Sequence, residues 1–160
     1  MNKILNLIYS THNEGKEKIV FLRDFILKHD GSCFTNDIRN TLKFFYKHIP
    51  LHFAYEEVVI NALLKSNLLT KEETSSMNKI LDEHIILKSN FEKLNVLSGK
   101  MYKACTKEQQ EDFLCLVNKT VEDLIKHAEY EDQYFYPIAN TKVNDALLSS
   151  IEKEISRIVY

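Results

Sequence analysis

Apolar residues recur at steps of three and four along most of the chain, the spacing that gathers side chains on one face of an α-helix. The longest such stripe, over residues 35–67, holds Ile38, Leu42, Phe45, Ile49, Val59 and Leu63. Similar stripes cover residues 12–30, 71–105 and 107–137, and a shorter one follows residue 144. The pattern therefore predicts an all-α protein with four long helices and a fifth at the C-terminal end.

Polar signals indicate where these helices begin. Three of these signals are capping boxes, in which the side chain of a Thr accepts from the amide three residues later and the Glu or Gln there accepts from the amide of the Thr. They are Thr11 to Glu14, Thr70 to Glu73 and Thr106 to Gln109. Asn144-Asp145 is expected to cap the last helix. Residues 1–10 are too short to stand alone, and we expect an arm packed on the body of the protein. Asp30-Gly31 should end the first helix.

Short connections make successive helices antiparallel neighbours. The chain has three Gly and two Pro in 160 residues, and no low-complexity tract or charge block divides it. We therefore expect residues 1–160 to form one domain, an up-and-down antiparallel four-helix bundle with an additional C-terminal helix. Pro50 lies inside the second helix, and its ring should kink that helix just before His52.

Two stretches of the chain share the pattern His-x-x-Tyr-Glu, one from His52 to Glu56 and one from His127 to Glu131. On a helix, side chains four positions apart lie on one face, about one turn from each other. An imidazole and a carboxylate placed in this way can both ligate the same metal ion. We therefore treat both pairs as candidate metal ligands.

The spacing of the histidines from the turns predicts that they meet at one level. His12 and His52 each lie 20 residues from a turn near residue 32, while His52 and His84 lie 17 and 15 residues from a turn near residue 69. His84 and His127 each lie 21 residues from the turn at 105–106, provided that the third helix runs through Gly99. The buried layer predicted from this register contains His12, His52, Glu56, His84, His127 and Glu131.

Such a layer is costly unless a cation neutralises its carboxylates. Nitrogen and oxygen ligands without sulfur suit iron, manganese or zinc, and two carboxylates suit a pair of ions that they bridge. With two imidazoles for each ion, room remains for a solvent-derived bridge and for an open position. Dioxygen, nitric oxide or peroxide would bind there.

Residues around this layer offer further partners. Metal-bound histidine usually donates its second ring N–H to an acceptor, and other side chains lie close enough in sequence to approach the open position or to ligate. Candidate acceptors for these N–H groups are Glu57, Glu83, Glu129 and Asp132, and further candidates are His48, Tyr55 and Tyr130. For the tyrosines the alternative is interface packing, and for the acids it is solvation.

Composition excludes several other classes of function. A formal charge of -2 gives no basic footprint for nucleic acid. No apolar run approaches the roughly 20 residues of a membrane span, and no secretory signal follows Met1, so we expect a cytoplasmic protein. The three cysteines lack CxxC spacing, and we expect reduced thiols.

These motifs resemble those of the hemerythrin-like, or HHE cation-binding, domain over nearly the whole chain. The resemblance is carried by His12, His52-x-x-x-Glu56-Glu57, Glu83-His84 and His127-x-x-x-Glu131 followed by Phe135-Tyr136-Pro137. It implies a four-helix bundle around two iron ions with an oxo or hydroxo bridge, with zinc or manganese as alternatives.

Within that family, four histidines and two glutamates look like the variants of iron-sulfur cluster repair proteins and iron-sensing domains. Dioxygen carriers use five histidines, with a His-x-x-x-His pair on the third helix, whereas this chain has Ile80 and Lys88 four residues from His84. Carriers also use His-x-x-x-x-Asp on the fourth helix, a spacing that Asp132 fits. The parallel with Glu56 favours Glu131 as the ligand.

Three functions remain open at this point. The chain is either a di-iron protein that reacts with or senses nitric oxide, dioxygen or peroxide, in stress defence or cluster repair, or a sensor or storage module for oxygen or iron without catalysis. A structural bundle that holds zinc or nothing is the third alternative. No catalytic side chains beyond the metal centre are expected.

Overall fold

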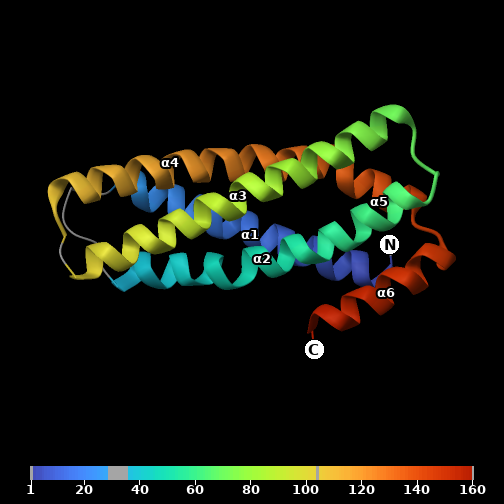
Figure 1. Ribbon diagram of the computed structural model, residues 1–160, viewed down its shortest axis with the longest axis horizontal. Helices are drawn as coiled ribbons and strands as arrows, with labels where there is room; N and C mark the ends of the chain where they lie inside the picture. The colour runs from blue at the N-terminus through green and yellow to red at the C-terminus, as the bar shows by residue number, and fades with distance from the viewer. Residues whose placement is uncertain (1, 29–35, 104, 160) are drawn as a thin grey trace.

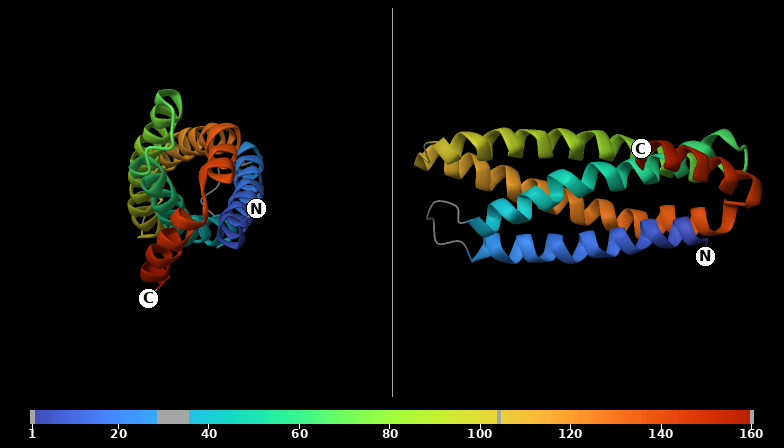
Figure 2. Two further views of the ribbon diagram at one scale, coloured as in Figure 1. Left: turned by 90° about the vertical axis from the view of Figure 1, so that its right-hand side faces the viewer. Right: turned by 90° about the horizontal axis from the view of Figure 1, so that it is seen from below.

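Four long helices lie side by side along one axis, with successive helices antiparallel (Figure 1). The computed structural model describes residues 2–28, 36–103 and 105–159. The four are α1 (Lys3–Leu27), α2 (Asn36–Lys65), α3 (Lys71–Lys103) and α4 (Lys107–Tyr130). Each contacts two of the others, so that α1, α2, α3 and α4 surround a common interior, as the end-on view in Figure 2 shows. Every element in the described ranges is helical, which confirms the all-α prediction.

The first helix begins nine residues earlier than predicted. Asn2 caps α1, because its side-chain oxygen accepts a hydrogen bond from the amide of Ile4 at 2.8 Å. The expected arm over residues 1–10 and the expected capping box at Thr11 are therefore wrong. Leu5 and Ile8 are buried on the same face as His12, and this packing extends the helix. The predicted stop at Asp30-Gly31 lies outside the described residues.

The other predicted helix starts are confirmed. Thr70 and Glu73 make both bonds of a capping box at 2.8 and 3.2 Å, and Thr106 and Gln109 make both at 3.2 Å. The side chain of Asn144 accepts a bond from the amide of Leu147 at 3.0 Å and so caps the last helix. Helix α3 runs through Gly99 without interruption, as the register required. Helix α2 is continuous across Pro50, and the kink stays a prediction.

A π-helical turn, η1 (Glu131–Phe135), follows α4 and leads into α5 (Tyr136–Lys142). The amide of Tyr136 donates to the carbonyl of Glu131, five residues back, where an α-helix would bond four residues back. Pro137 explains the wider turn, because its ring would clash with the carbonyl of Gln133 in an α-helix and it has no N–H to donate. The helical segment therefore continues beyond Pro137, where the sequence pattern suggested an end.

The predicted C-terminal helix is present as α6 (Asp145–Val159) and packs against α2. Figure 2 shows that it begins at the end of the long helices where the N-terminus lies and turns back beside them. Its residue Ile151 is buried at 1% exposure within the apolar interior. No helix in the described ranges combines the length and the apolar character needed to cross a bilayer.

Two apolar clusters fill the interior, one toward each end of the long helices. The first contains Ile19, Leu22, Phe45, Phe53, Leu87, Phe91, Val117 and Leu124, and the second contains Leu5, Ile8, Val59, Leu63, Met77, Ile80 and Phe135. On each long helix the sequence passes from one cluster to the other across a buried polar residue. A polar layer therefore lies between the two apolar clusters. Charges within that layer interact more strongly than they would in water.

The cysteines differ from the prediction. Cys105 is disulfide-bonded, so the expectation of a reduced thiol is wrong there. Cys115 is free and exposed. Cys33 lies outside the described residues.

Candidate metal centre

Four histidines from four helices meet in the polar layer. His12 comes from α1, His52 from α2, His84 from α3 and His127 from α4, and all are buried except His52, whose side chain is 11% exposed. The rings form two pairs, with centroids 5.9 Å apart for His12 and His52 and 4.9 Å apart for His84 and His127. The four histidines therefore meet at one level, as the residue counts to the turns predicted.

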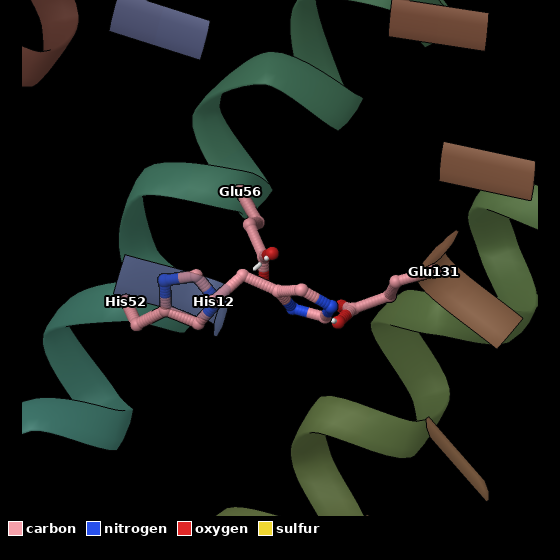
Figure 3. Close-up of side chains that lie close together, drawn as sticks. All are labelled: His12, His52, Glu56 and Glu131. Atoms are coloured by element: carbon pink, nitrogen blue, oxygen red, sulfur yellow. Dashed lines mark ion pairs between the residues drawn. The ribbon is translucent and has the colours of Figure 1, made fainter. Parts of the chain in front are cut away.

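The carboxylate of Glu131 lies between the two pairs. Its Oε2 is 3.3 Å from Nδ1 of His12, while its Oε1 is 2.8 Å from Nε2 of His127 and 3.2 Å from Nε2 of His84. Figure 3 shows this carboxylate pointing toward His12 from the opposite side of the layer. One oxygen of Glu131 thus faces each histidine pair, as a bridging ligand requires.

Glu56 has the same relationship to the two pairs from the α2 side. Its Oε1 is 3.0 Å from Nε2 of His52, and its Oε2 is 3.5 Å from Nε2 of His84. Both carboxylates are buried, at 0% exposure for Glu56 and 1% for Glu131. Each histidine pair therefore faces one oxygen from each glutamate.

Donor atoms of these residues are close enough to hold a cation. One set comprises His12, His52, Glu56 and Glu131, and the other His84, His127 and Glu131, with the atoms of each set within 4.8 Å of one another. Nε2 of His52, Nε2 of His127 and Oε2 of Glu56 are buried without a well-formed hydrogen bond, although each has an oppositely charged neighbour. Buried polar atoms rarely stay unsatisfied, and one cation beside each histidine pair would satisfy these three.

The second ring nitrogen of each histidine has a partner on the outside of the layer. Nδ1 of His127 lies 2.7 Å from Glu83, Nδ1 of His84 lies 3.1 Å from Glu57, and Nε2 of His12 lies 3.0 Å from Asp132. These three acids were among the predicted outer partners. Such contacts fix the ring orientation of metal-bound histidine and raise its basicity.

Each of the three acids also contacts the ammonium group of a lysine. Nζ of Lys88 lies 2.6 Å from Glu57, Nζ of Lys79 lies 3.7 Å from Glu83, and Lys16 contacts Asp132. The lysines balance the negative charge of the outer acids at the partly exposed edge of the layer. Each of these three imidazoles therefore contacts a carboxylate, and that carboxylate contacts an ammonium group.

Nδ1 of His52 contacts the neutral hydroxyl of Thr11, where the other three histidines contact an acid. The Thr11 hydroxyl donates its one hydrogen to the carbonyl of Ile8 at 2.8 Å, so it accepts from Nδ1–H of His52 at 3.0 Å. In the neutral imidazole, Nε2 of His52 then carries the lone pair and faces the centre. This is the tautomer that a metal ligand requires.

Electrostatics of the layer follow from these contacts. Burial lowers the pKa of His84, but hydrogen bonds to Glu131, Glu56 and Glu57 outweigh it and raise that pKa to about 10. For His127 burial likewise lowers the pKa, while the charge of Glu131 and the bond to Glu83 raise it to about 9. Burial raises the pKa of Glu131, but the His127 charge and bonds from three imidazoles hold it well below its ordinary value. Without a bound metal, the layer therefore pairs anionic carboxylates with protonated imidazoles.

Tyr136 adds a buried hydroxyl to the layer that the sequence reasoning did not include. Its hydroxyl donates to Oε1 of Glu56 at 2.7 Å. Burial and the negative charges of Glu56 and Glu131 raise the pKa of this phenol, which stays protonated. The π-turn causes this placement, because it brings Tyr136, five residues beyond Glu131, onto the same face of the helix. Pro137 was the sequence signal for that turn.

A cavity of about 80 Å³ leads from the surface to the layer between α1, α2 and α4. Its walls include the exposed residues Glu14 and His48 and the buried residues His12 and Glu131. His84 does not line it, and the ring of Phe53 stacks on His84 with centroids 3.9 Å apart. Small molecules can therefore approach the layer from the His12 and His52 side.

The remaining candidates lie outside the centre. His48 is exposed at the cavity mouth and packs on Phe44, with ring centroids 4.5 Å apart. Tyr130 packs on Tyr134, with centroids 4.4 Å apart, and Glu129 is exposed. Tyr55 lines the cavity. Among these residues, only Tyr55 keeps the predicted approach to an open position.

No protein-family model, no curated protein and no solved structure matches this chain.

Proposed function

We propose that this chain is a hemerythrin-like, non-haem di-iron protein built on an up-and-down antiparallel four-helix bundle with an added C-terminal helix. In this proposal it binds two iron ions and reacts with or senses nitric oxide, dioxygen or peroxide. The observation that carries the proposal is that Glu56 and Glu131 each direct one oxygen toward each histidine pair. Two ions bridged by two carboxylates would fit this arrangement.

His12 and His52 would hold one ion, and His84 and His127 would hold the other. Each ion would then have two imidazoles and two carboxylate oxygens from the protein. Iron is favoured because imidazole and carboxylate ligands suit it and because the site contains no thiolate. Zinc and manganese are the alternatives, and metal analysis distinguishes them.

A pair of ferrous ions would supply electrons to small oxidants and would bind nitric oxide. The protein's own contribution is to exclude bulk water with two apolar clusters and to admit small molecules through the cavity beside His12 and His52. Its outer acids hold the imidazoles in their ligating orientation. Reaction with small molecules and sensing are both compatible with this arrangement.

The test is metal analysis of the full chain purified from iron-replete cells, followed by rapid mixing. We expect about two irons per chain, and less than about half an equivalent of total metal would contradict the proposal. The reduced protein, mixed with oxygenated buffer and followed optically, should oxidise without a long-lived adduct. An adduct that returns to the reduced spectrum on degassing would favour the sensor or storage module.

A further inference from the structure

Tyr136 and Tyr9 connect the buried layer to the protein surface. The hydroxyl of Tyr136 donates to Glu56, and its ring lies 4.8 Å from the ring of His12, centroid to centroid. The ring of Tyr9 meets Tyr136 edge-on with centroids 4.9 Å apart, and Tyr9 is 37% exposed. Two oxidisable phenols therefore lie in contact between the layer and solvent.

We propose that Tyr136 is a one-electron donor to the metal centre and that Tyr9 returns the electron to Tyr136 from the protein surface. The proposal rests on the proposed di-iron function. It assigns a redox role to two residues outside the proposed ligand set, one of which the π-turn places against the carboxylate of Glu56.

Electron counting shows why such a donor is useful. Full reduction of dioxygen to two waters takes four electrons and four protons, and oxidation of two ferrous ions to ferric supplies two of those electrons. Tyr136 supplies the third: its O–H bond breaks, the electron passes to the centre and the proton passes to Oε1 of Glu56, 2.7 Å away. That oxygen would give up its bond to the ion as it takes the proton, and would bind the ion again when the proton leaves. Without such a donor, partly reduced oxygen would remain beside buried side chains.

Tyr9 completes the reduction. It gives an electron to the Tyr136 radical and releases its own phenol proton to solvent, while Glu56 returns a proton to Tyr136. A second oxidation of Tyr136 then supplies the fourth electron, and the remaining protons come from solvent. Two tyrosyl radicals result, and a thiol reductant in solution restores both phenols as two thiols become one disulfide.

The geometry favours this pair over Tyr130 and Tyr134. Tyr130 and Tyr134 pack on each other, and Lys79 lies over the Tyr130 ring, 3.6 Å from its centroid. A cation on the ring face disfavours the loss of an electron from that ring. Tyr136 has the opposite surroundings, because its hydroxyl meets a carboxylate that can take the proton.

The experiment loads the full-length protein anaerobically with two equivalents of ferrous iron, mixes it with oxygenated buffer and freezes samples at successive times. Electron paramagnetic resonance should detect an organic radical, and ring-deuterated tyrosine should narrow its signal. Tyr136→Phe keeps the ring and removes the O–H, and should lower the radical yield per bound iron at least about tenfold. Tyr134→Phe, the matched control, should leave the yield unchanged.

Tyr9→Phe tests the relay without touching the hydrogen bond to Glu56. Metal content should stay at the wild-type value, whereas the radical on Tyr136 should disappear at least about tenfold more slowly when thiol is added. Wild-type protein that binds two irons and oxidises without any organic radical would overturn this inference alone. An equal radical yield in Tyr136→Phe, or an unchanged decay in Tyr9→Phe, would also overturn it. Failure to bind iron would overturn the di-iron function as well.

Discussion

Glu131 and Asp132 contact the same imidazole from opposite sides. Oε2 of Glu131 lies 3.3 Å from Nδ1 of His12, and Oδ1 of Asp132 lies 3.0 Å from Nε2. The two acids are neighbours in sequence, yet Glu131 is buried at the centre while Asp132 meets Lys16 at the edge of the layer. Only one of the two can bridge a pair of ions, and this geometry favours Glu131.

Glu131→Ala should therefore remove a bridge and lose most of the bound metal, whereas Asp132→Asn should retain two ions with affinity reduced by about 10- to 100-fold. The reason is that Asp132 only orients His12, while Glu131 faces both histidine pairs. Metal analysis after gel filtration measures the first effect, and competition with a coloured chelator measures the second. Loss of metal in Asp132→Asn with retention in Glu131→Ala would show that the carrier-like His-x-x-x-x-Asp spacing is the true one.

Thr11 should control the tautomer of His52. Thr11→Val removes the oxygen that accepts Nδ1–H and leaves that buried N–H without a partner, so we expect the affinity of one of the two ions to fall by about 10-fold or more. Thr11→Ser keeps the hydroxyl and should bind like the wild type. Isothermal titration with ferrous or cobaltous ion under anaerobic conditions resolves the two binding events. Equal weakening in both variants would mean that packing, not the hydrogen bond, is responsible.

Metal binding should release protons. The raised pKa values of His84 and His127, about 10 and about 9, leave both imidazoles protonated at pH 7 when metal is removed by chelation. A metal takes neutral imidazole, so loading the site should release about two protons from this pair. Calorimetry in buffers of different ionisation enthalpy counts them. His48→Ala should leave the count unchanged, and a count near zero in the wild type would contradict the expectation.

The chelated protein should be most stable in mildly acidic solution. The pKa values of His84 and His127 are raised above the ordinary 6.5, so their stabilisation is complete below 6.5 and is lost as the pH rises through about 9 and 10. The pKa of Glu131 is lowered, so its contribution is complete above 4.5 and is lost as the pH falls further. The free energy of unfolding should therefore be largest between 4.5 and 6.5.

Denaturant unfolding across pH measures this profile. Glu83→Gln removes a partner that raises the pKa of His127, and this variant should lose less stability between neutral and alkaline pH than the wild type. Glu129→Gln, at an exposed position of α4, should keep the wild-type profile. Stability that rises steadily toward alkaline pH would contradict the assigned pairing.

Much of this protein follows from local sequence. The apolar periodicity predicted the helices, and the boxes at Thr70 and Thr106 predicted where α3 and α4 start, because a cap is decided within one helical turn. The levels of His12, His52, His84 and His127 followed from counting residues to the turns. That count works because antiparallel helices rise by the same distance for each residue.

Other features were decided only by packing between distant segments. Thr11 has the sequence of a cap, but burial of Leu5 and Ile8 extends α1 past it, and its hydroxyl meets His52, 41 residues away. Tyr136 reaches Glu56 across 80 residues because a π-turn shifts the helical register by one residue. The choice between Glu131 and Asp132 likewise depends on which side chain faces the interior. Helical periodicity sets the face of a residue to within a turn, and only the packed neighbours determine which atom each side chain contacts.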